Sequence, residues 1–279
     1  MSPLVVCPTP IGNLADVTLR VLDELRAADL VACEDTRRSR TLLEHYDISA
    51  RTVSLNEHNE QARIGELLER LDRGERIALV SDAGTPAVSD PGARLLAAAR
   101  AAGHEPVVLP GASAVTTAAV ASGLAADGFV FAGFLPKSGA GLRASVERAG
   151  RAGVAIVAFE SPRRLPATLR ALADVEPDRP GAVCRELSKL HEQIDRGSLA
   201  ELAERFSEPP RGEVVLVLAA PASRPAGLPD QAALAELAAA IGAARAATLA
   251  ARLTGAPRNA LYRALTSSAA SASRHDSQT

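Results

Sequence analysis

The sequence predicts an α/β protein with two α/β domains, followed by a small helical segment of helix-turn-helix-like form. Three observations support this fold class. Strand-like and helix-like patterns alternate along most of the chain, as they do in α/β domains. The 279 residues leave room for two modest domains of this kind. The composition, 47% hydrophobic and 23% charged, is that of a soluble globular protein with a packed core.

The first domain, residues 1–115, is predicted from short apolar runs that alternate with amphipathic segments. This rhythm predicts a largely parallel sheet that is covered on both faces. One further helix is expected to begin at Asp90-Pro91, with Asp90 as the N-cap and Pro91 in the first helical position. The expected strands are 4–7, 30–33, 52–55, 77–81 and 106–109, and the expected helices are 18–28, 39–46 and 59–73.

The second domain is expected over residues 116–221. Its boundary is placed within a helix expected over 113–122, and its strands and remaining helices follow that helix. The expected strands are 129–134, 154–159, 182–186 and 213–219, and the expected helices are 142–152, 164–173 and 199–206. Three prolines between 221 and 229 predict a linker over 222–230. Residues 231–266 are expected to form helices, and the Ser- and Ala-rich tail, 267–279, is expected to be disordered.

Four loops rich in glycine and proline follow predicted strands, at 8–13, 81–92, 110–114 and 160–164. Glycine permits close backbone approach and positive φ, and proline fixes a turn. In open α/β sheets, ligands bind beyond the carboxyl ends of the strands. Any one of these loops is compatible with an ordinary turn. The four together favour a small-molecule cleft made of backbone amides and small side chains.

Long motifs in a fixed order connect the chain with a known family. They are PTPIGNLADVTLR, CEDTRRSRTLL, NEHNE, LVSDAGTPAVSDPG, LPGASAVTTA, GFLP, FESPRRL and RELSKLHE. Over roughly residues 4–265 the chain closely resembles the bacterial 16S rRNA cytidine-2′-O-methyltransferases, a family of the tetrapyrrole methylase superfamily. The resemblance implies a homodimer with S-adenosylmethionine in a cleft between two α/β domains. It also implies a cytidine of 16S rRNA in the small ribosomal subunit as the target.

The same resemblance implies a set of cofactor-binding residues. Gly84, Thr85 and Pro86 correspond to the superfamily's Gly-Asp-Pro turn, with threonine in place of the acid and Asp82 just upstream. The other residues match the first loop, the PGxSA contact and a strand end that borders the cofactor. They are Pro10, Gly12, Ser113, Ala114, Glu160 and Ser161.

Methyl transfer to a ribose hydroxyl is an in-line displacement with a good, neutral leaving group, so positioning and desolvation contribute much of the rate. A 2′-hydroxyl is poorly acidic, and a base or a cation near the developing alkoxide would help. We assign Asp35 as the expected base and Lys189 as the expected partner of the alkoxide or of a phosphate. For either residue the structural alternative is a helix cap or a surface ion pair. Other charged candidates near strand ends are Glu34, Arg37, Glu57, His58, Arg185 and Glu186.

The C-terminal segment carries a local positive charge on a chain whose net charge is −2. From residue 237 to residue 275 there are five arginines and no acid, and Gly255 marks the turn between two helices. Arginines dock onto RNA phosphates electrostatically, so Arg258 and Arg263 are expected to bind RNA. The alternative is a helical cap that packs on the catalytic domains.

Several classes of protein are disfavoured. Cys7, Cys33 and Cys184 are isolated in apolar runs, so neither a zinc site nor a disulfide framework is expected, no metal is expected, and a reducing cytoplasm fits. No apolar run approaches the roughly 18 residues of a membrane span, so no membrane partner is expected. Two alternatives stay open. One is a methyltransferase acting on a corrinoid or porphyrin precursor, and the other is a ligand-sensing regulator that binds nucleic acid.

Overall fold

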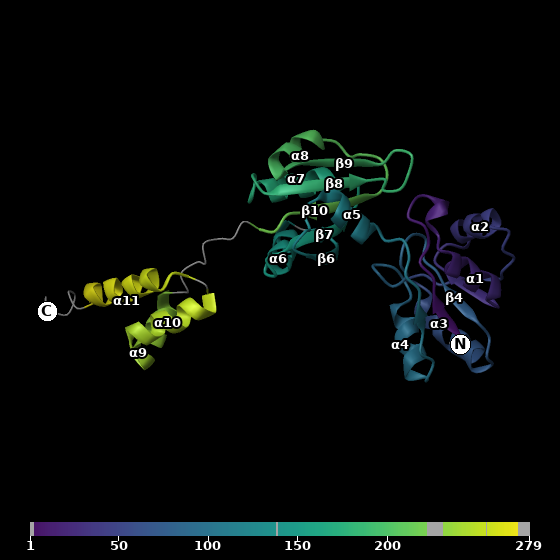
Figure 1. The fold of residues 1–279 in the computed structure, drawn as a ribbon, viewed down its shortest axis with the longest axis horizontal. Helices are drawn as coiled ribbons and strands as arrows, with labels where there is room; N and C mark the ends of the chain where they lie inside the picture. Colours follow the sequence, from purple (N-terminus) through teal and green to yellow (C-terminus); the bar gives the residue numbers. More distant parts are fainter. Residues whose placement is uncertain (1–2, 138, 222–230, 255, 273–279) are drawn as a thin grey trace. The chain divides into compact units, whose positions relative to one another are not determined.

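The computed structural model describes residues 3–137, 139–221, 231–254 and 256–272, and the chain divides into two compact units, 1–220 and 221–279 (Figure 1). The predicted linker at 222–230 and the predicted turn residue Gly255 lie outside the described residues. Of the helices in these described ranges, none combines the length and the apolar character that crossing a bilayer requires.

The first sheet has five parallel strands in the order β3-β2-β4-β1-β5, which confirms the predicted parallel sheet. Short runs of apolar residues form these strands, and the central strand β4 pairs with β2 on one side and β1 on the other. Their bounds are β1 (Leu4–Val6), β2 (Leu30–Cys33), β3 (Thr52–Ser54), β4 (Ile77–Leu79) and β5 (Val107–Val108).

Helices cover both faces of this sheet, because successive side chains of each strand point to opposite sides. Val5 of β1 packs in the cluster with α1 (Leu19–Ala27) and α2 (Thr36–His45). Its neighbours Leu4 and Val6 pack in the cluster with α3 (Glu60–Asp72) and α4 (Ala93–Ala101). A short 3-10 helix, η1 (Leu14–Asp16), follows β1.

The start of α4 differs from the prediction. The helix begins at Ala93, and its N-cap is Gly92 at φ +118°, not Asp90. The cap is supplied from another element: Oε1 of the buried Glu60, the first residue of α3, accepts backbone N–H groups at the start of α4. The donors are Gly92 at 3.1 Å, Arg94 at 3.0 Å and Leu95 at 3.2 Å. A carboxylate at a helix N-terminus is stabilised by the helix dipole as well as by these bonds.

The second sheet is mixed, in the order β6-β7-β10-β8-β9. β6 and β7 are parallel, and the other pairs are antiparallel. β9 was not predicted because its sequence, QIDRGS, is polar; it is an edge strand that pairs only with β8. The strand bounds are β6 (Phe129–Phe134), β7 (Ala155–Glu160), β8 (Pro180–Arg185), β9 (Gln193–Ser198) and β10 (Val214–Leu218).

Helices α6 (Gly139–Gly150), α7 (Leu165–Ala173) and α8 (Leu199–Arg205) contribute to the core on one face of this sheet. α5 (Ala114–Ser122) packs on the other face, where Val115, Ala118 and Ala119 share a core with Val157 and Val217. The boundary placed between residues 115 and 116 therefore falls inside α5. The whole helix belongs with the second sheet, because its apolar side chains are buried there.

The C-terminal unit is formed by α9 (Gln231–Ile241), α10 (Ala243–Thr254) and α11 (Arg258–Ala272), so the predicted helices are present. Its core is small and rich in alanine, with Leu234, Leu261 and Leu265 around Ala246 and Ala250. α11 continues to Ala272, so residues 267–272 of the predicted disordered tail are helical. Residues 273–279 lie outside the described part of the chain.

The capping role of Glu60 can be tested by substitution. Glu60→Ala should lower the free energy of unfolding by about 2–3 kcal/mol, because buried donors at the start of α4 lose their acceptor. Glu60→Gln keeps an oxygen there and should lose less. Urea denaturation measures both changes. Glu69→Ala, at an exposed position of α3, is the control and should change stability by less than about 0.5 kcal/mol. A Glu60→Ala protein as stable as its parent would rule out the cap.

Candidate functional site

The two loops that follow β1 and β4 are joined by an isolated antiparallel bridge between Thr9 and Gly84. The N–H of Thr9 donates to the Gly84 oxygen at 2.8 Å, and the N–H of Gly84 donates to the Thr9 oxygen at 2.9 Å. The buried hydroxyl of Thr9 also donates to the Ser81 carbonyl at 3.0 Å. Gly84 has φ +78°, a conformation that glycine adopts without the strain a side chain causes. The predicted first and second loops therefore form one rigid structure.

A cavity of about 370 Å³ lies where these loops meet the second sheet. Its volume is within the range of small-molecule sites. Six of the predicted cofactor residues line it, from three of the four predicted loops: Gly84, Thr85, Ser113, Ala114, Glu160 and Ser161. The first loop contributes Ile11, which the sequence reasoning did not single out. Apolar walls come from side chains that include Val115, Phe134, Phe159, Leu187 and Val215.

Four predicted cofactor residues are not among those lining this cavity. Pro10 and Asp82 line a separate hollow beside α2, and Pro86 is buried. Gly12 is exposed, and the reason for glycine there is packing. A Cβ at Gly12 would lie 2.4 Å from Cγ of Lys189 and 2.7 Å from the Leu187 oxygen. Gly12 thus permits the first loop to approach the loop after β8.

The first turn of α5 faces the cavity through Ser113 and Ala114. Ser113 is the N-cap residue, but its side chain makes no capping hydrogen bond. Backbone donors at a helix N-terminus suit a carboxylate or another anion, and the serine hydroxyl adds a further donor.

Glu160 is 2% exposed and is fully engaged by its neighbours. Its Oε1 accepts the N–H of Ser161 at 2.6 Å and pairs with the guanidinium of Arg164 at 2.5 Å. Its Oε2 accepts the hydroxyl of Thr168 at 2.7 Å. These contacts fix the end of β7 against α7, and the carboxylate of Glu160 is fully buried among them.

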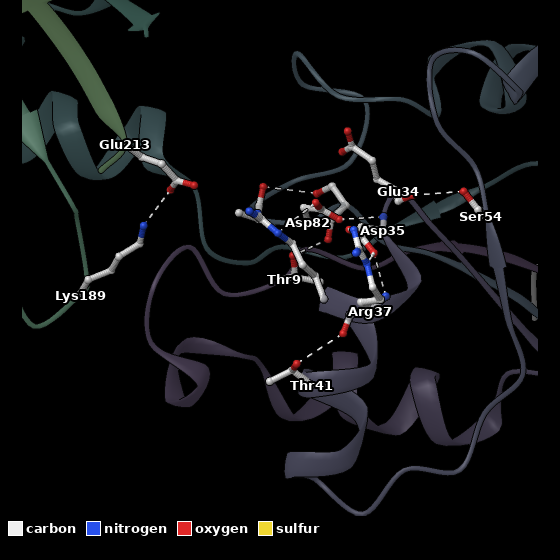
Figure 2. Close-up of polar contacts among 12 residues, drawn as sticks. Thr9, Glu34, Asp35, Arg37, Thr41, Ser54, Asp82, Lys189 and Glu213 are labelled. Atoms are coloured by element: carbon white, nitrogen blue, oxygen red, sulfur yellow. Dashed lines mark hydrogen bonds and ion pairs between the residues drawn. The ribbon is translucent and has the colours of Figure 1, made fainter. Parts of the chain in front are cut away.

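Asp35 is placed as a helix cap. Figure 2 shows it beside Asp82, with Arg37 alongside. Oδ1 of Asp35 accepts the N–H of Arg37 at 2.9 Å and its Nε at 3.1 Å, and Oδ2 pairs with the same guanidinium at 2.7 Å. The hydrogen bonds from Arg37 lower the pKa of Asp35 to about 2. Such a carboxylate is a weak base, and Asp35 does not line the cavity. Its contacts favour the structural alternative over the catalytic one.

Lys189 lies apart from this acidic group, paired with Glu213 (Figure 2). Its Nζ is 2.8 Å from Glu186 and 3.1 Å from Glu213. Burial lowers its pKa, but the hydrogen bonds to the two glutamates prevail and raise it. The ammonium is therefore charged and already has two carboxylate partners. Lys189 lines a separate hollow with Gly12, and of this pair only Glu213 lines the cavity described above.

Asp90 is the cavity residue that sequence reasoning misassigned, as a helix cap. It lines the cavity with Gly84 and Thr85. Burial, and the charge of Asp82, raise the pKa of Asp90 to about 6, although a hydrogen bond with Ser81 opposes the change. Burial, and then Asp82 and Asp90, also raise the pKa of Glu34. In the sequence, Asp90 is the second of the two acids in SDAGTPAVSD. Only the folded loop shows that Asp90, and not Asp82, lines the cavity.

The charged residues that line the cavity are all acidic, and two of them are ion-paired, Glu160 with Arg164 and Glu213 with Lys189. The acids Asp90, Glu160 and Glu213 line the cavity, and no lysine or arginine among the described residues does. Carboxylates in an apolar, partly enclosed space favour a ligand with a positive charge next to an apolar portion. In the part of the chain the structure describes, no group of three or more His, Cys, Asp or Glu side chains is arranged to hold a metal ion.

The predicted RNA-binding residues are on the C-terminal unit. Arg258 and Arg263 are exposed on α11, as are Arg245 and Arg252 on α10. Nε of Arg258 donates to the Thr248 hydroxyl at 2.9 Å, which ties α11 to α10. The described residues from 237 to 272 contain no acid, so these charges are not neutralised within α10 and α11.

Comparison of the sequence with known proteins places the chain in a family. The sequence model described as Tetrapyrrole (Corrin/Porphyrin) Methylases matches residues 3–203, and that of the RsmI C-terminal HTH domain matches residues 227–268. The chain is 44% identical to the "Ribosomal RNA small subunit methyltransferase I" of Mesorhizobium japonicum, over 94% of this chain and 90% of that protein. It is 41% identical to the protein of the same name from Escherichia coli O157:H7, over 93% of each.

Solved structures with the same fold are more distant in sequence. A diphthine synthase superposes with a TM-score of 0.62 at 18% identity, over 77% of this chain and 89% of that one. The methyltransferase CobJ superposes with a TM-score of 0.61 at 22% identity, over 79% of this chain and 95% of that one. These likenesses establish the fold, and at such identities they establish nothing about the substrate.

Proposed function

Because the chain belongs to the tetrapyrrole methylases, and among them to the ribosomal RNA small subunit methyltransferases I, we propose that it methylates 16S rRNA. The methyl donor is S-adenosylmethionine, and the acceptor is the ribose 2′-hydroxyl of a cytidine. The observation that supports this reaction best is the cavity, which is acidic, free of lysine and arginine among the described residues, and walled by apolar side chains. A sulfonium cofactor has the complementary charge.

The residues of the cavity fit the three parts of such a cofactor. The first turn of α5, with Ser113, offers donors to the methionyl carboxylate. The carboxylates of the wall favour the sulfonium, and Phe134, Phe159 and Val215 offer apolar surface to the nucleoside. When bound, the cofactor supplies an electrophilic methyl group on a good leaving group. The chain's own contribution is to hold that methyl carbon in line with the hydroxyl and to exclude water.

The choice of RNA over a tetrapyrrole depends on the relatives and on the C-terminal unit. Proteins of this fold carry names of tetrapyrrole and diphthine enzymes as well, so the fold leaves the substrate open. Relatives at 41–46% identity are named for ribosomal RNA of the small subunit. Exposed arginines on α10 and α11, with Tyr262 41% exposed among them, provide phosphate contacts and a surface for base stacking.

The proposal includes a homodimer that acts in the cytoplasm. The edge strand β5 supports self-association, because Val107 is 40% exposed and Val108 is 54% exposed. An uncovered apolar edge of a sheet is a surface that proteins normally pair or bury.

Labelled methyl transfer decides among the candidate functions. We expect label from S-adenosylmethionine to enter small ribosomal subunits that lack the modification, and nuclease digestion to yield 2′-O-methylcytidine. Porphyrin and corrinoid precursors serve as the alternative acceptors. Label in a tetrapyrrole but not in RNA would support the first alternative. Binding of the cofactor and of nucleic acid without any transfer would support a regulator.

The docking role of the C-terminal unit predicts a change in salt dependence. Each arginine–phosphate contact releases counterions, so a protein carrying both Arg258→Ala and Arg263→Ala should bind RNA more weakly. The slope of log affinity against log salt should fall by roughly 1.5. A chain that ends at Ala220 should lose more of the slope and still bind cofactor, because the cavity lies within residues 1–220.

The control carries Arg73→Ala and Arg100→Ala, which remove as much charge from exposed arginines that are paired with Glu75 and Glu105. It should leave the slope nearly unchanged. Melting temperatures of all proteins are measured in parallel. A large loss of stability with an unchanged salt slope would mean that the helices only cap the core.

A further inference from the structure

We propose that Asp90 is the general base of the methyl transfer and takes the proton of the attacking ribose hydroxyl. This assignment rests on the proposed function. It replaces Asp35, whose carboxylate is held by Arg37 and does not line the cavity.

Few side chains that line the cavity could act as the general base. Four groups in its lining can titrate: Asp90, Glu160, Cys184 and Glu213. Glu160 is engaged by Arg164, Thr168 and the Ser161 N–H, as described above. Glu213 pairs with Lys189 at 3.1 Å. Cys184 is buried, and burial raises the pKa of its thiol to about 11, so it stays protonated at neutral pH.

Asp90 differs from the two glutamates in having no cationic partner. Among the described residues no lysine, arginine or histidine forms an ion pair with it, and a hydrogen bond with Ser81 lowers its pKa against the effect of burial. The nearby charged groups are Asp82 and Glu34, and a neighbouring cation, Arg38, is paired with Asp82 at 3.5 Å. An oxygen of Asp90 is therefore available to a hydroxyl that enters the cavity.

The loop holds this carboxylate in place. Ala87 has φ +67° and Ser89 has φ +62°, so two residues with side chains occupy the left-handed region next to Asp90. The N–H of Ala87 donates to the Pro91 oxygen at 3.2 Å and closes the loop around these positions. Strained backbone of this kind persists only where surrounding contacts fix it, and it is concentrated at functional sites.

The proton affinity of Asp90 suits the task. With a pKa of about 6, the group is mostly ionised at pH 7.5 and is far more basic than Asp35. In the step, the 2′-oxygen uses a lone pair to bond to the methyl carbon while its proton passes to Asp90. The bond between that carbon and the sulfur breaks, and its electron pair stays on the sulfur as a neutral thioether. Asp90 then releases the proton to solvent.

The test combines single turnover with binding, using the full chain and small subunits that lack the modification. The transfer rate of the parent should rise with pH through about 6, because the base must be ionised, and then level off. Asp90→Asn should lower the plateau by roughly a hundredfold or more and remove this dependence. Calorimetry should show a loss of S-adenosylmethionine affinity much smaller than the loss of rate, because Asp90 is one of three acids in the cavity lining, and the rates are compared at saturating cofactor. Asp127→Asn, at an exposed position before β6, is the matched control and should behave as the parent.

A second readout does not depend on activity. In the cofactor-free protein with ¹³C-labelled aspartates, one carboxyl resonance should titrate near pH 6 in the parent and be missing from Asp90→Asn. A full transfer rate in Asp90→Asn would overturn the assignment, as would loss of the pH dependence in Asp35→Asn alone. Weak cofactor binding with a normal rate at saturation would make Asp90 a cofactor ligand instead. Absence of transfer by the parent would contradict the proposed function itself.

Discussion

The bridge between Thr9 and Gly84 is the constraint on which the site depends. Parallel strands β1 and β4 end side by side, and their loops have no sheet hydrogen bonds to continue. The paired backbone bonds, and the Thr9 hydroxyl on the Ser81 carbonyl, supply the missing partners. With these loops fixed, Ile11, Gly84 and Thr85 form one side of the cavity. Buried backbone groups that pair in this way also resist rearrangement, since breaking them would leave unsatisfied donors.

The fold also gives neighbouring acids of the first domain different electrostatic environments. The loops after β2 and β4 carry Glu34, Asp35, Asp82 and Asp90 close together, and the arginines of α2 neutralise only part of this group. Arg37 lowers the pKa of Asp35, while burial and the negative charge of Asp82 raise the pKa of Asp90. Neighbouring carboxylates thus acquire different proton affinities, which is how one site provides both a structural acid and a base. In the proposed function, the arginines of α10 and α11 supply the local positive charge that a slightly acidic chain needs to bind RNA.

Much of this fold could be predicted from local patterns. The parallel strands, the helices between them and the four loops that reach the cavity follow from apolar periodicity and from glycine and proline at strand ends. Features set by distant residues could not be predicted. β9 is polar, and only pairing with β8 identifies it as a strand. The cap of α4 comes from Glu60, more than thirty residues away along the chain.

The roles of the site residues also depend on contacts between distant parts of the chain, so the sequence alone could not predict them. Gly12 matches a cofactor loop in sequence, yet its missing side chain makes room for Lys189 and Leu187. Asp35 and Asp90 look alike as acids after strands, and what separates them is burial and the position of Arg37. Proton affinity depends on neighbours in space, so residue type and spacing cannot rank candidate bases.

Calorimetric binding of S-adenosylmethionine to two glycine variants tests the central claim most directly. Gly84 and Gly74 have nearly equal φ, +78° and +80°, but only Gly84 lines the cavity. Alanine at either position should cost about 1 kcal/mol of stability through backbone strain. Only Gly84→Ala should also weaken cofactor binding, by roughly tenfold, or about 1.4 kcal/mol, because it distorts the bridge. Unchanged affinity in a folded Gly84→Ala protein, or an equal loss in Gly74→Ala, would contradict the account.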